Sequence, residues 1–155
     1  MIRKAENRDL PKIKDLLSQV LLVHHNGRPD IFKGGCRKYT DGEIVELISD
    51  PQTPIFVYDD GERGVLGYAF CIIKETRGDN ILTDMKTLYI DDLCVDEGER
   101  GTGVGKALYL HTLNFAREIG CYNVTLNVWE CNPGAKRFYE KMGLLPQKTV
   151  MELIL

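Results

Sequence analysis

The sequence predicts a mixed α/β fold, in which a mostly antiparallel central sheet carries helices on both faces. Three observations predict this class. Apolar residues recur at helical spacing near the start of the chain, two β-type runs joined by a hairpin signal follow, and the last third alternates strand and helix patterns. Antiparallel hairpins followed by strand–helix–strand–helix–strand imply a mixed sheet that helices cover on both sides.

The start of the chain predicts a short strand and two helices. A strand near Ile2–Ala5 leads into a helix over Asp9–Val23, where apolar residues have helical spacing. The stretch HHNGRPDIFKGGCRKY is polar, rich in glycine and without a period, so it predicts a loop. A second helix is expected to begin at Thr40, which forms a capping box with Glu43.

The rest of the chain predicts strands with two further helices. Strand character is found in five runs: PIFVYDD, GVLGYAFCIIKE, KTLYIDDLCV, YNVTLNVW and KTVMELIL. DDGERG, between the first two, is a hairpin signal. Helical spacing marks Val104–Gly120 and the segment NPGAKRFYEKMG, which ends at Gly143. The apolar ending VMELIL could extend a sheet across a homodimer.

Size and charge narrow the class of protein. The 155 residues, 43% of them hydrophobic, fit one domain over residues 1–155 that buries its own core. Twenty basic and twenty-three acidic residues give a net charge of -3. Nucleic acid is therefore not expected as a partner, because binding to a phosphate backbone is usually driven by basic excess. A cationic amine suits this balance better.

Cysteine spacing and the absence of long apolar runs indicate the compartment. The five cysteines contain no C-x-x-C pair, so neither a zinc knuckle nor a disulfide framework is expected, and no metal is predicted. The opening MIRKAENRDL has no stretch of signal-peptide length, and no run is long enough to span a membrane. We expect a cytoplasmic protein without a membrane partner.

The segment ERGTGVGKA lies between a strand that ends at Val95 and a helix that opens at Gly103. The first amides of a helix have no partner inside it, and the helix dipole adds partial positive charge there. Glycines at alternate positions remove Cβ atoms, so a pyrophosphate can approach these amides. A tight strand-to-helix turn would use the same glycines.

Two common phosphate loops do not fit this segment. A Walker A motif would need glycine where Arg100 stands, and Ala107 replaces its Ser/Thr. The dinucleotide fingerprint G-x-G-x-x-G would need a third glycine at Lys106. The pattern that fits is R-x-x-G-x-G, formed by Arg100, Gly103 and Gly105.

Together, LYIDDLCVDEGERGTGVGKAL and NPGAKRFYEKMGL resemble the two main motifs of the GNAT superfamily of acetyl-CoA-dependent N-acetyltransferases. The resemblance covers roughly Leu88–Leu145. It implies a GNAT-like sheet in which the strand before the glycine loop splays from the next strand. It also implies acetyl-CoA as cosubstrate and direct transfer of the acetyl group to a primary amine, without a covalent enzyme intermediate.

The resemblance assigns residues to coenzyme A. The loop would hold its pyrophosphate through Arg100, Gly101, Gly103, Val104, Gly105 and Lys106. Lys106 can equally be a solvated residue of the first helical turn. The splay would free backbone groups of Leu93 and Val95 for the pantetheine amides and the thioester carbonyl. Asn132 corresponds to the asparagine that contacts the cofactor arm, and it can also cap a helix.

The resemblance also suggests the catalytic groups. Asp91 matches an acidic position and is the preferred base, although an exposed carboxylate is the alternative. Strand alternation predicts that Asp91 and Asp92 lie on opposite faces, with Asp92 in a structural hydrogen bond. Tyr139 matches the tyrosine near the sulfur, a candidate general acid for the thiolate. Its alternative role is packing beside Phe138, which is the better core candidate.

The acceptor side is the least patterned part of the sequence. In the superfamily, the loop between the first two helices forms part of the acceptor wall, so His24, His25, Asp30 and Phe32 are candidates for contact with the amine. A solvated or hydrogen-bonded histidine pair is the alternative. A non-catalytic acyl-CoA-binding regulatory module is the alternative function, against which the presence of Asp91 and Tyr139 argues.

Overall fold

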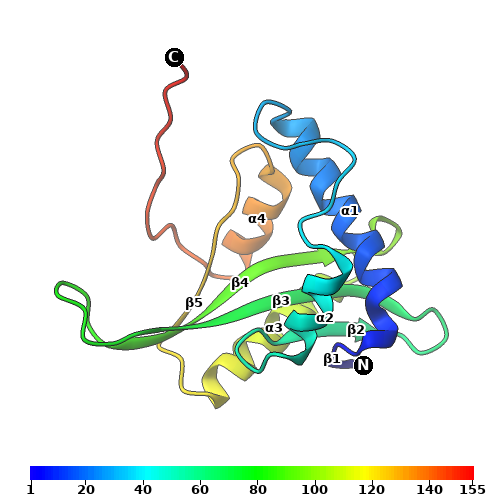
Figure 1. Cartoon of the computed structure of the whole chain (residues 1–155), viewed down its shortest axis with the longest axis horizontal. Coiled ribbons are helices and arrows are strands. Elements are labelled where there is room, and N and C mark those ends of the chain that lie inside the picture. Colours follow the sequence, from blue (N-terminus) through cyan, green and yellow to red (C-terminus); the bar gives the residue numbers. More distant parts are fainter.

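The computed structural model describes all 155 residues, and a five-stranded sheet organises them (Figure 1). The strands follow the order β1-β2-β3-β4-β5, and every neighbouring pair is antiparallel except β4 and β5, which are parallel. Their bounds are β1 Ile2–Lys4, β2 Ile55–Asp59, β3 Val65–Thr76, β4 Met85–Val95 and β5 Asn123–Leu126. The predicted mixed α/β class is confirmed.

Helices cover both faces of this sheet and bury two core clusters. The helices are α1 Leu10–Gly27, α2 Asp41–Ser49, α3 Val104–Glu118 and α4 Pro133–Lys141. Short 3-10 turns occupy Asn7–Asp9 and Glu97–Glu99. One cluster joins α1 and α2 to Tyr68 and Phe70, and the other joins α3 to Ala69 and Cys71 on the opposite face of β3.

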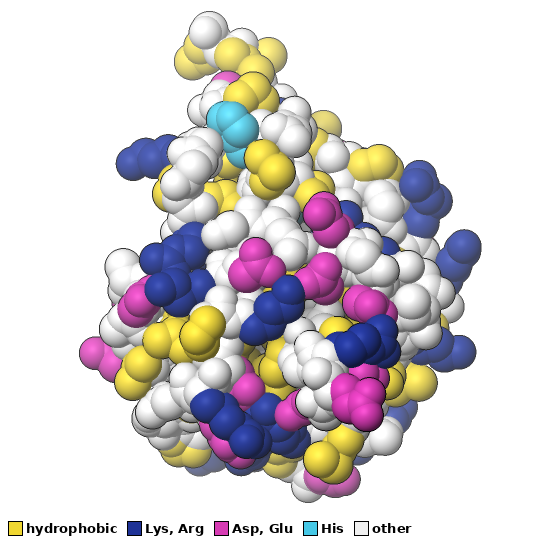
Figure 2. All heavy atoms as spheres, turned by 90° about the vertical axis from the view of Figure 1, so that its right-hand side faces the viewer, with side chains coloured by type: hydrophobic (Ala, Val, Ile, Leu, Met, Phe, Trp, Pro, Cys, Tyr) yellow, Lys and Arg dark blue, Asp and Glu magenta, His cyan; other side chains and the backbone are white.

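The surface carries both signs of charge. On the face that Figure 2 shows, Lys and Arg side chains are interspersed with Asp and Glu and form no single basic patch. No helix combines the length and the apolar character that crossing a membrane would require.

Local sequence chemistry sets several boundaries as predicted. Thr40 Oγ1 accepts a hydrogen bond from Glu43 N at 3.3 Å, and the Glu43 carboxylate accepts one from Thr40 N at 2.7 Å, so the capping box begins α2. In the β2–β3 hairpin, Asp60 N donates to Gly64 O at 2.9 Å. Gly64 has φ of 74°, a conformation that glycine adopts without steric cost.

Three predicted boundaries are wrong. α1 continues to Gly27, so His24 and His25 lie in its last turn, because polar residues extend a helix without extending its apolar stripe. β5 is shorter than YNVTLNVW, since its pairing with β4 stops at Leu126. Residues 148–155 form no strand, because no strand of the chain lies beside them to pair with.

Arg3 joins the first strand to two distant acidic residues. Its guanidinium donates to Asp9 at 2.7 and 2.8 Å and to Asp59 at 2.8 and 2.9 Å. The side chains of Arg3 and Asp9 are only 17% and 5% exposed. Removing one partner of such a pair leaves a charge uncompensated, so Arg3→Ala should lower the free energy of unfolding by about 3 kcal/mol, measured by urea denaturation.

The matched control for this prediction is Arg63→Ala. Arg63 pairs with Asp60 and Glu99 but is 56% exposed, so its loss should cost less than about 1 kcal/mol. Although burial opposes it, the bond from Arg3 keeps the pKa of Asp9 below its ordinary value. The Arg3 contribution should therefore be present at neutral pH and be lost as the pH falls below about 4. Equal costs for the two variants would contradict the prediction.

Candidate functional site

A cleft opens where β4 and β5 separate. Their pairing runs from Thr87 opposite Asn123 to Ile90 opposite Leu126, and β4 then continues without β5 to Val95. Asp96 N donates to Leu66 O in β3 at 2.9 Å. Because backbone groups alternate between the two edges of a strand, those of Leu93 and Val95 point into the open edge. Arg100 Nε donates to Val95 O at 3.4 Å from that side.

The glycine loop lies at the end of this open edge. Gly101 has φ of 82° and Gly103, the N-cap of α3, has φ of 98°; an L side chain would be strained at both. The first helical bond runs from Ala107 N to Gly103 O at 2.9 Å, and the amides of Val104, Gly105 and Lys106 have no backbone acceptor. Such a row of free amides fits the pyrophosphate of coenzyme A.

Side chains around this loop leave room for a ligand. Arg100 and Lys106 are exposed. A Cβ at Gly105 would lie 3.3 Å from Val95 Cγ2, so glycine allows α3 to pack closely on the strand. The loop geometry agrees with the prediction, while binding of coenzyme A by these residues stays a prediction.

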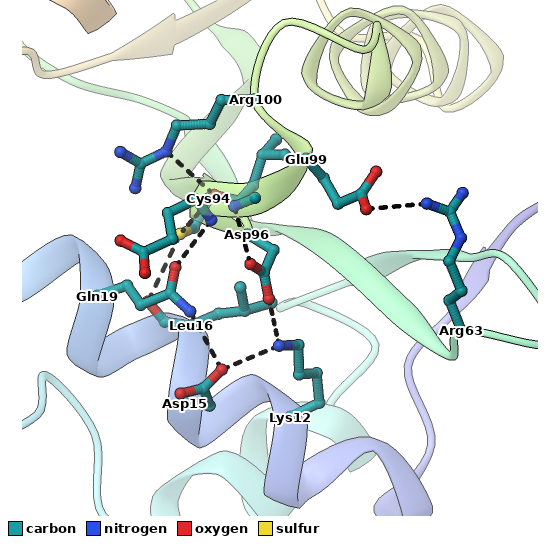
Figure 3. Close-up of polar contacts among 12 residues, drawn as sticks. Lys12, Asp15, Leu16, Gln19, Arg63, Cys94, Asp96, Glu99 and Arg100 are labelled. Carbon is teal, nitrogen blue, oxygen red and sulfur yellow. Dashed lines mark hydrogen bonds and ion pairs between the residues drawn. The ribbon is translucent and has the colours of Figure 1, made fainter.

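Ion pairs and hydrogen bonds tie the loop to the first layer of the molecule (Figure 3). Lys12 of α1 pairs with Asp96, and Gln19 Oε1 accepts from Glu97 N at 3.1 Å. Arg63, in the β2–β3 hairpin, pairs with Glu99 at 2.8 Å. The approach to the glycine loop is therefore held from α1 and from the hairpin, and this fixes the loop before any ligand binds.

Gly103→Val should weaken the binding of acetyl-CoA by about tenfold or more. A β-branched residue at this φ costs about 1–3 kcal/mol of backbone strain, which the loop relieves by abandoning its conformation. Titration calorimetry with acetyl-CoA measures the change. Gly98→Ala is the matched control, because Gly98 lies in the same approach with an ordinary φ and open space around its Cα. Equal affinities in the two variants would count against the loop as the binding site.

A β-bulge places two carboxylates on one face of β4. Phe70 pairs with Asp92 and Cys71 pairs with Ile90, so Asp91 is an extra residue without a partner. Ile90 and Leu93 both pack into the α3 core, which leaves Asp91 and Asp92 on the face of α1 and α2. The prediction that they lie on opposite faces is wrong, because the extra residue interrupts the alternation.

The two carboxylates have different partners. Asp91 pairs with Lys38 Nζ at 2.8 Å and accepts a hydrogen bond from the Tyr39 hydroxyl. Asp92 accepts one from Tyr68 Oη at 2.8 Å, as its expected structural role requires. Burial raises the pKa of Asp92 to about 6, against the opposing effects of Tyr68 and Lys38. Asp92 is thus a carboxylate with the basicity that acid–base chemistry near neutral pH needs.

Tyr139 lies on α4, across the cleft from β4. Its ring lies 5.2 Å from that of Phe138 and 6.4 Å from that of Tyr109, while Phe138 packs into the α3 core as expected. Burial and the charge of Asp92 raise the pKa of Tyr139, so it carries its proton at neutral pH. Its hydroxyl makes no hydrogen bond within the chain, which leaves that proton available to a ligand. Asn132 Oδ1 caps α4 by accepting from Ala135 N at 3.2 Å.

The acceptor candidates divide into an aromatic cluster and an ion pair. The rings of His24 and Phe32 stack at 5.0 Å, and Phe32 meets Trp129 edge-on at 4.9 Å. His25 Nδ1 lies 2.7 Å from Phe32 O and so holds this loop. Burial and then Lys38 lower the pKa of His24. Asp30 is paired with Arg28 at 2.7 Å and exposed, so the structure does not bring it to the cluster.

Lys38, Tyr39 and Trp129 were not identified from the sequence. Lys38 and Tyr39 end a loop without a period, and the stack of Tyr39 on Phe70, at 5.7 Å, exists only once the chain is folded. Trp129, the single tryptophan, follows β5 at the cleft, and its rarity was the one available signal.

Known proteins share this architecture. The model of the acetyltransferase (GNAT) family matches residues 24–144. A probable glucosamine 6-phosphate N-acetyltransferase 2 of Oryza sativa subsp. japonica is 28% identical over 115 residues, which cover 73% of this chain and 60% of that protein. The glucosamine 6-phosphate N-acetyltransferase of Trypanosoma brucei brucei is 34% identical over 103 residues, covering 65% and 64%.

A solved structure agrees over the full chain. The crystal structure of a mutant BH1408 protein from Bacillus halodurans has a TM-score of 0.96 at 28% identity and covers 100% of this chain and 99% of that one. The mixed sheet with its splayed parallel pair defines an acetyltransferase fold. The chain belongs to the acetyltransferase (GNAT) family. It spans about three-fifths of the length of the curated relatives it matches.

Proposed function

We propose that this chain is an N-acetyltransferase that moves the acetyl group of acetyl-CoA directly to a primary amine. The observation that carries the proposal is the open edge of β4, which has a glycine loop at its end and a carboxylate pair within it. Membership of the GNAT family supports acetyl-CoA as the cosubstrate. The single domain and the cytoplasmic location expected from the sequence stay predictions.

Each part of the cleft has a role in this proposal. The amides of Val104, Gly105 and Lys106 bind the pyrophosphate, with Arg100 adding charge, and Asn132 contacts the cofactor arm. Backbone groups of Leu93 and Val95 bind the pantetheine amides, and one N–H polarises the thioester carbonyl. No nucleophilic side chain is needed, because the amine attacks the carbonyl itself.

Proton transfer falls to three side chains. Asp91 is the base expected from the sequence; its ion pair with Lys38 keeps it as a fixed charge that attracts the ammonium form of the acceptor. Asp92, with a pKa of about 6, accepts the proton through water as the amine becomes neutral. Tyr139 donates its proton to the departing thiolate of coenzyme A. This assignment extends the base from one carboxylate to the Asp91–Asp92 pair.

The acceptor is proposed as an amine that lies against an aromatic wall. His24, Phe32 and Trp129 form that wall beside Lys38, and His25 fixes its backbone. Relatives named for glucosamine 6-phosphate and for peptidyl-lysine both present a primary amine, which supports that class of acceptor.

Release of free CoA during incubation with acetyl-CoA and a panel of amines tests the function. The panel contains an amino sugar phosphate, a polyamine, an aminoglycoside and a lysine peptide. Amine-dependent release with acetylated product is the expected result. Tight binding of acetyl-CoA without turnover on any amine would instead favour a non-catalytic acyl-CoA-binding module.

A further inference from the structure

The last twelve residues stand clear of the body of the chain. After α4, residues 144–155 run as an extended segment that rises away from the sheet (Figure 1), and hydrophobic side chains stand at the top of Figure 2 at the same height. Large apolar side chains in this segment are 74–112% exposed: Leu145, Val150, Met151, Leu153, Ile154 and Leu155. An exposed apolar set of this kind marks a surface that another molecule covers.

The segment has the pattern of a strand. Met151, Leu153 and Leu155 alternate with Val150, Glu152 and Ile154, so one face of an extended chain would be wholly apolar. We refer to residues 148–155 as the C-terminal strand segment. Without a partner its backbone groups have no acceptors or donors, so the segment becomes a strand only when it joins an existing edge.

β5 offers such an edge. It pairs with β4 alone and is the last strand of the sheet. Tyr122 N donates to Lys86 O beside β4 at 2.8 Å. Since alternate residues of a strand face opposite edges, the backbone groups of Asn123 and Thr125 point to the outer, unpaired edge. An unpaired edge is a template for a further strand.

The segment of the same chain is held away from this edge. Both guanidinium nitrogens of Arg28, next to α1, bind the Glu152 carboxylate at 2.9 Å. Pairing with its own β5 would require the segment to give up this contact. The extended course is shared with the Bacillus halodurans crystal structure, because a TM-score of 0.96 over the full chain leaves no room for twelve residues placed elsewhere.

We propose that two copies of this chain exchange their C-terminal strand segments, each adding a strand to the outer edge of the other's β5. A reciprocal exchange uses the same two surfaces on both copies, so it closes as a dimer and leaves no free edge. It also covers the apolar side chains that are exposed in one copy. Because β5 forms one wall of the cleft, the added strand supports that wall from outside.

Sedimentation velocity at about 10–100 µM protein tests the exchange, a range in which a stable dimer is fully formed. The wild-type chain should sediment at twice its mass of 17.6 kDa. Leu153→Asp should sediment as a monomer, because it places a charge on the apolar face of the strand segment. Gln147→Asp adds the same charge outside that segment and should remain a dimer. A monomeric wild-type chain, or a dimeric Leu153→Asp variant, overturns the proposal.

A second pair of variants tests the edge itself. Thr125→Pro removes an outward N–H of β5 without removing a bond to β4, so it should dissociate the dimer. Thr125→Val keeps that N–H and should remain dimeric. Circular dichroism of both variants shows whether they fold. A folded Thr125→Pro variant that stays dimeric overturns pairing at β5 and assigns the dimer to contacts between the two segments.

Discussion

Replacing Tyr139 by Phe is expected to lower kcat by about 100-fold while the Kd for acetyl-CoA stays near that of the wild type. The ring packs between Phe138 and Tyr109, and Phe preserves that packing. Only the hydroxyl is lost, whose proton is held by a raised pKa and has no partner within the chain. Steady-state kinetics with a good amine acceptor and titration calorimetry separate the two quantities.

Tyr109→Phe is the control for this experiment. Tyr109 is buried beside Tyr139 on α3 and would also lose one hydroxyl, yet it is assigned no proton transfer. Its kcat should remain within a few-fold of the wild type. An unchanged kcat in Tyr139→Phe, or equal losses in both variants, would remove Tyr139 from the mechanism.

Replacing Asp92 by Asn is expected to lower kcat/KM by about 10²–10⁴-fold at pH 7 and to abolish the acid limb of the pH–rate profile. Burial raises the pKa of this carboxyl to about 6. The base acts in its ionised form, so wild-type activity should fall as the pH drops through 6 and the carboxylate becomes protonated. Measuring kcat/KM between pH 5 and pH 9 on the wild type and the variant tests both statements.

Asp91→Asn distinguishes the two carboxylates. The charge of Asp91 raises the pKa of Asp92 and that of Lys38 lowers it. Removing Asp91 also leaves Lys38 without its ion-pair partner. The acid limb should therefore move to lower pH in Asp91→Asn rather than disappear. An acid limb that survives unchanged in Asp92→Asn would assign it to another group.

Much of the fold could be predicted from local sequence chemistry. The capping box at Thr40 and the turn glycines act within a few residues, so their effect is visible in the sequence before any tertiary contact is known. The strand expected over residues 148–155 failed for the opposite reason. Its residues have the pattern of a strand, but a strand also needs a neighbouring edge, which no local pattern supplies.

The same distinction separates the parts of the candidate site. The glycine loop could be predicted because free amides and positive φ angles follow from residue types at fixed spacing. The surroundings of Asp91 could not, because Lys38 and Tyr39 reach it from a part of the chain more than fifty residues earlier. The aromatic cluster likewise joins Phe32 to Trp129 across most of the sequence.

The single extra residue in β4 has a consequence for any mutational scan of this strand. Up to Ile90, even-numbered positions face the α3 core; from Leu93 onward, odd-numbered positions do. Tolerance to polar substitution should therefore invert its phase between these two residues. An alignment that carries roles across β4 by counting forward from Leu88 will assign side chains to the wrong side of the sheet, whereas counting back from Val95 will not.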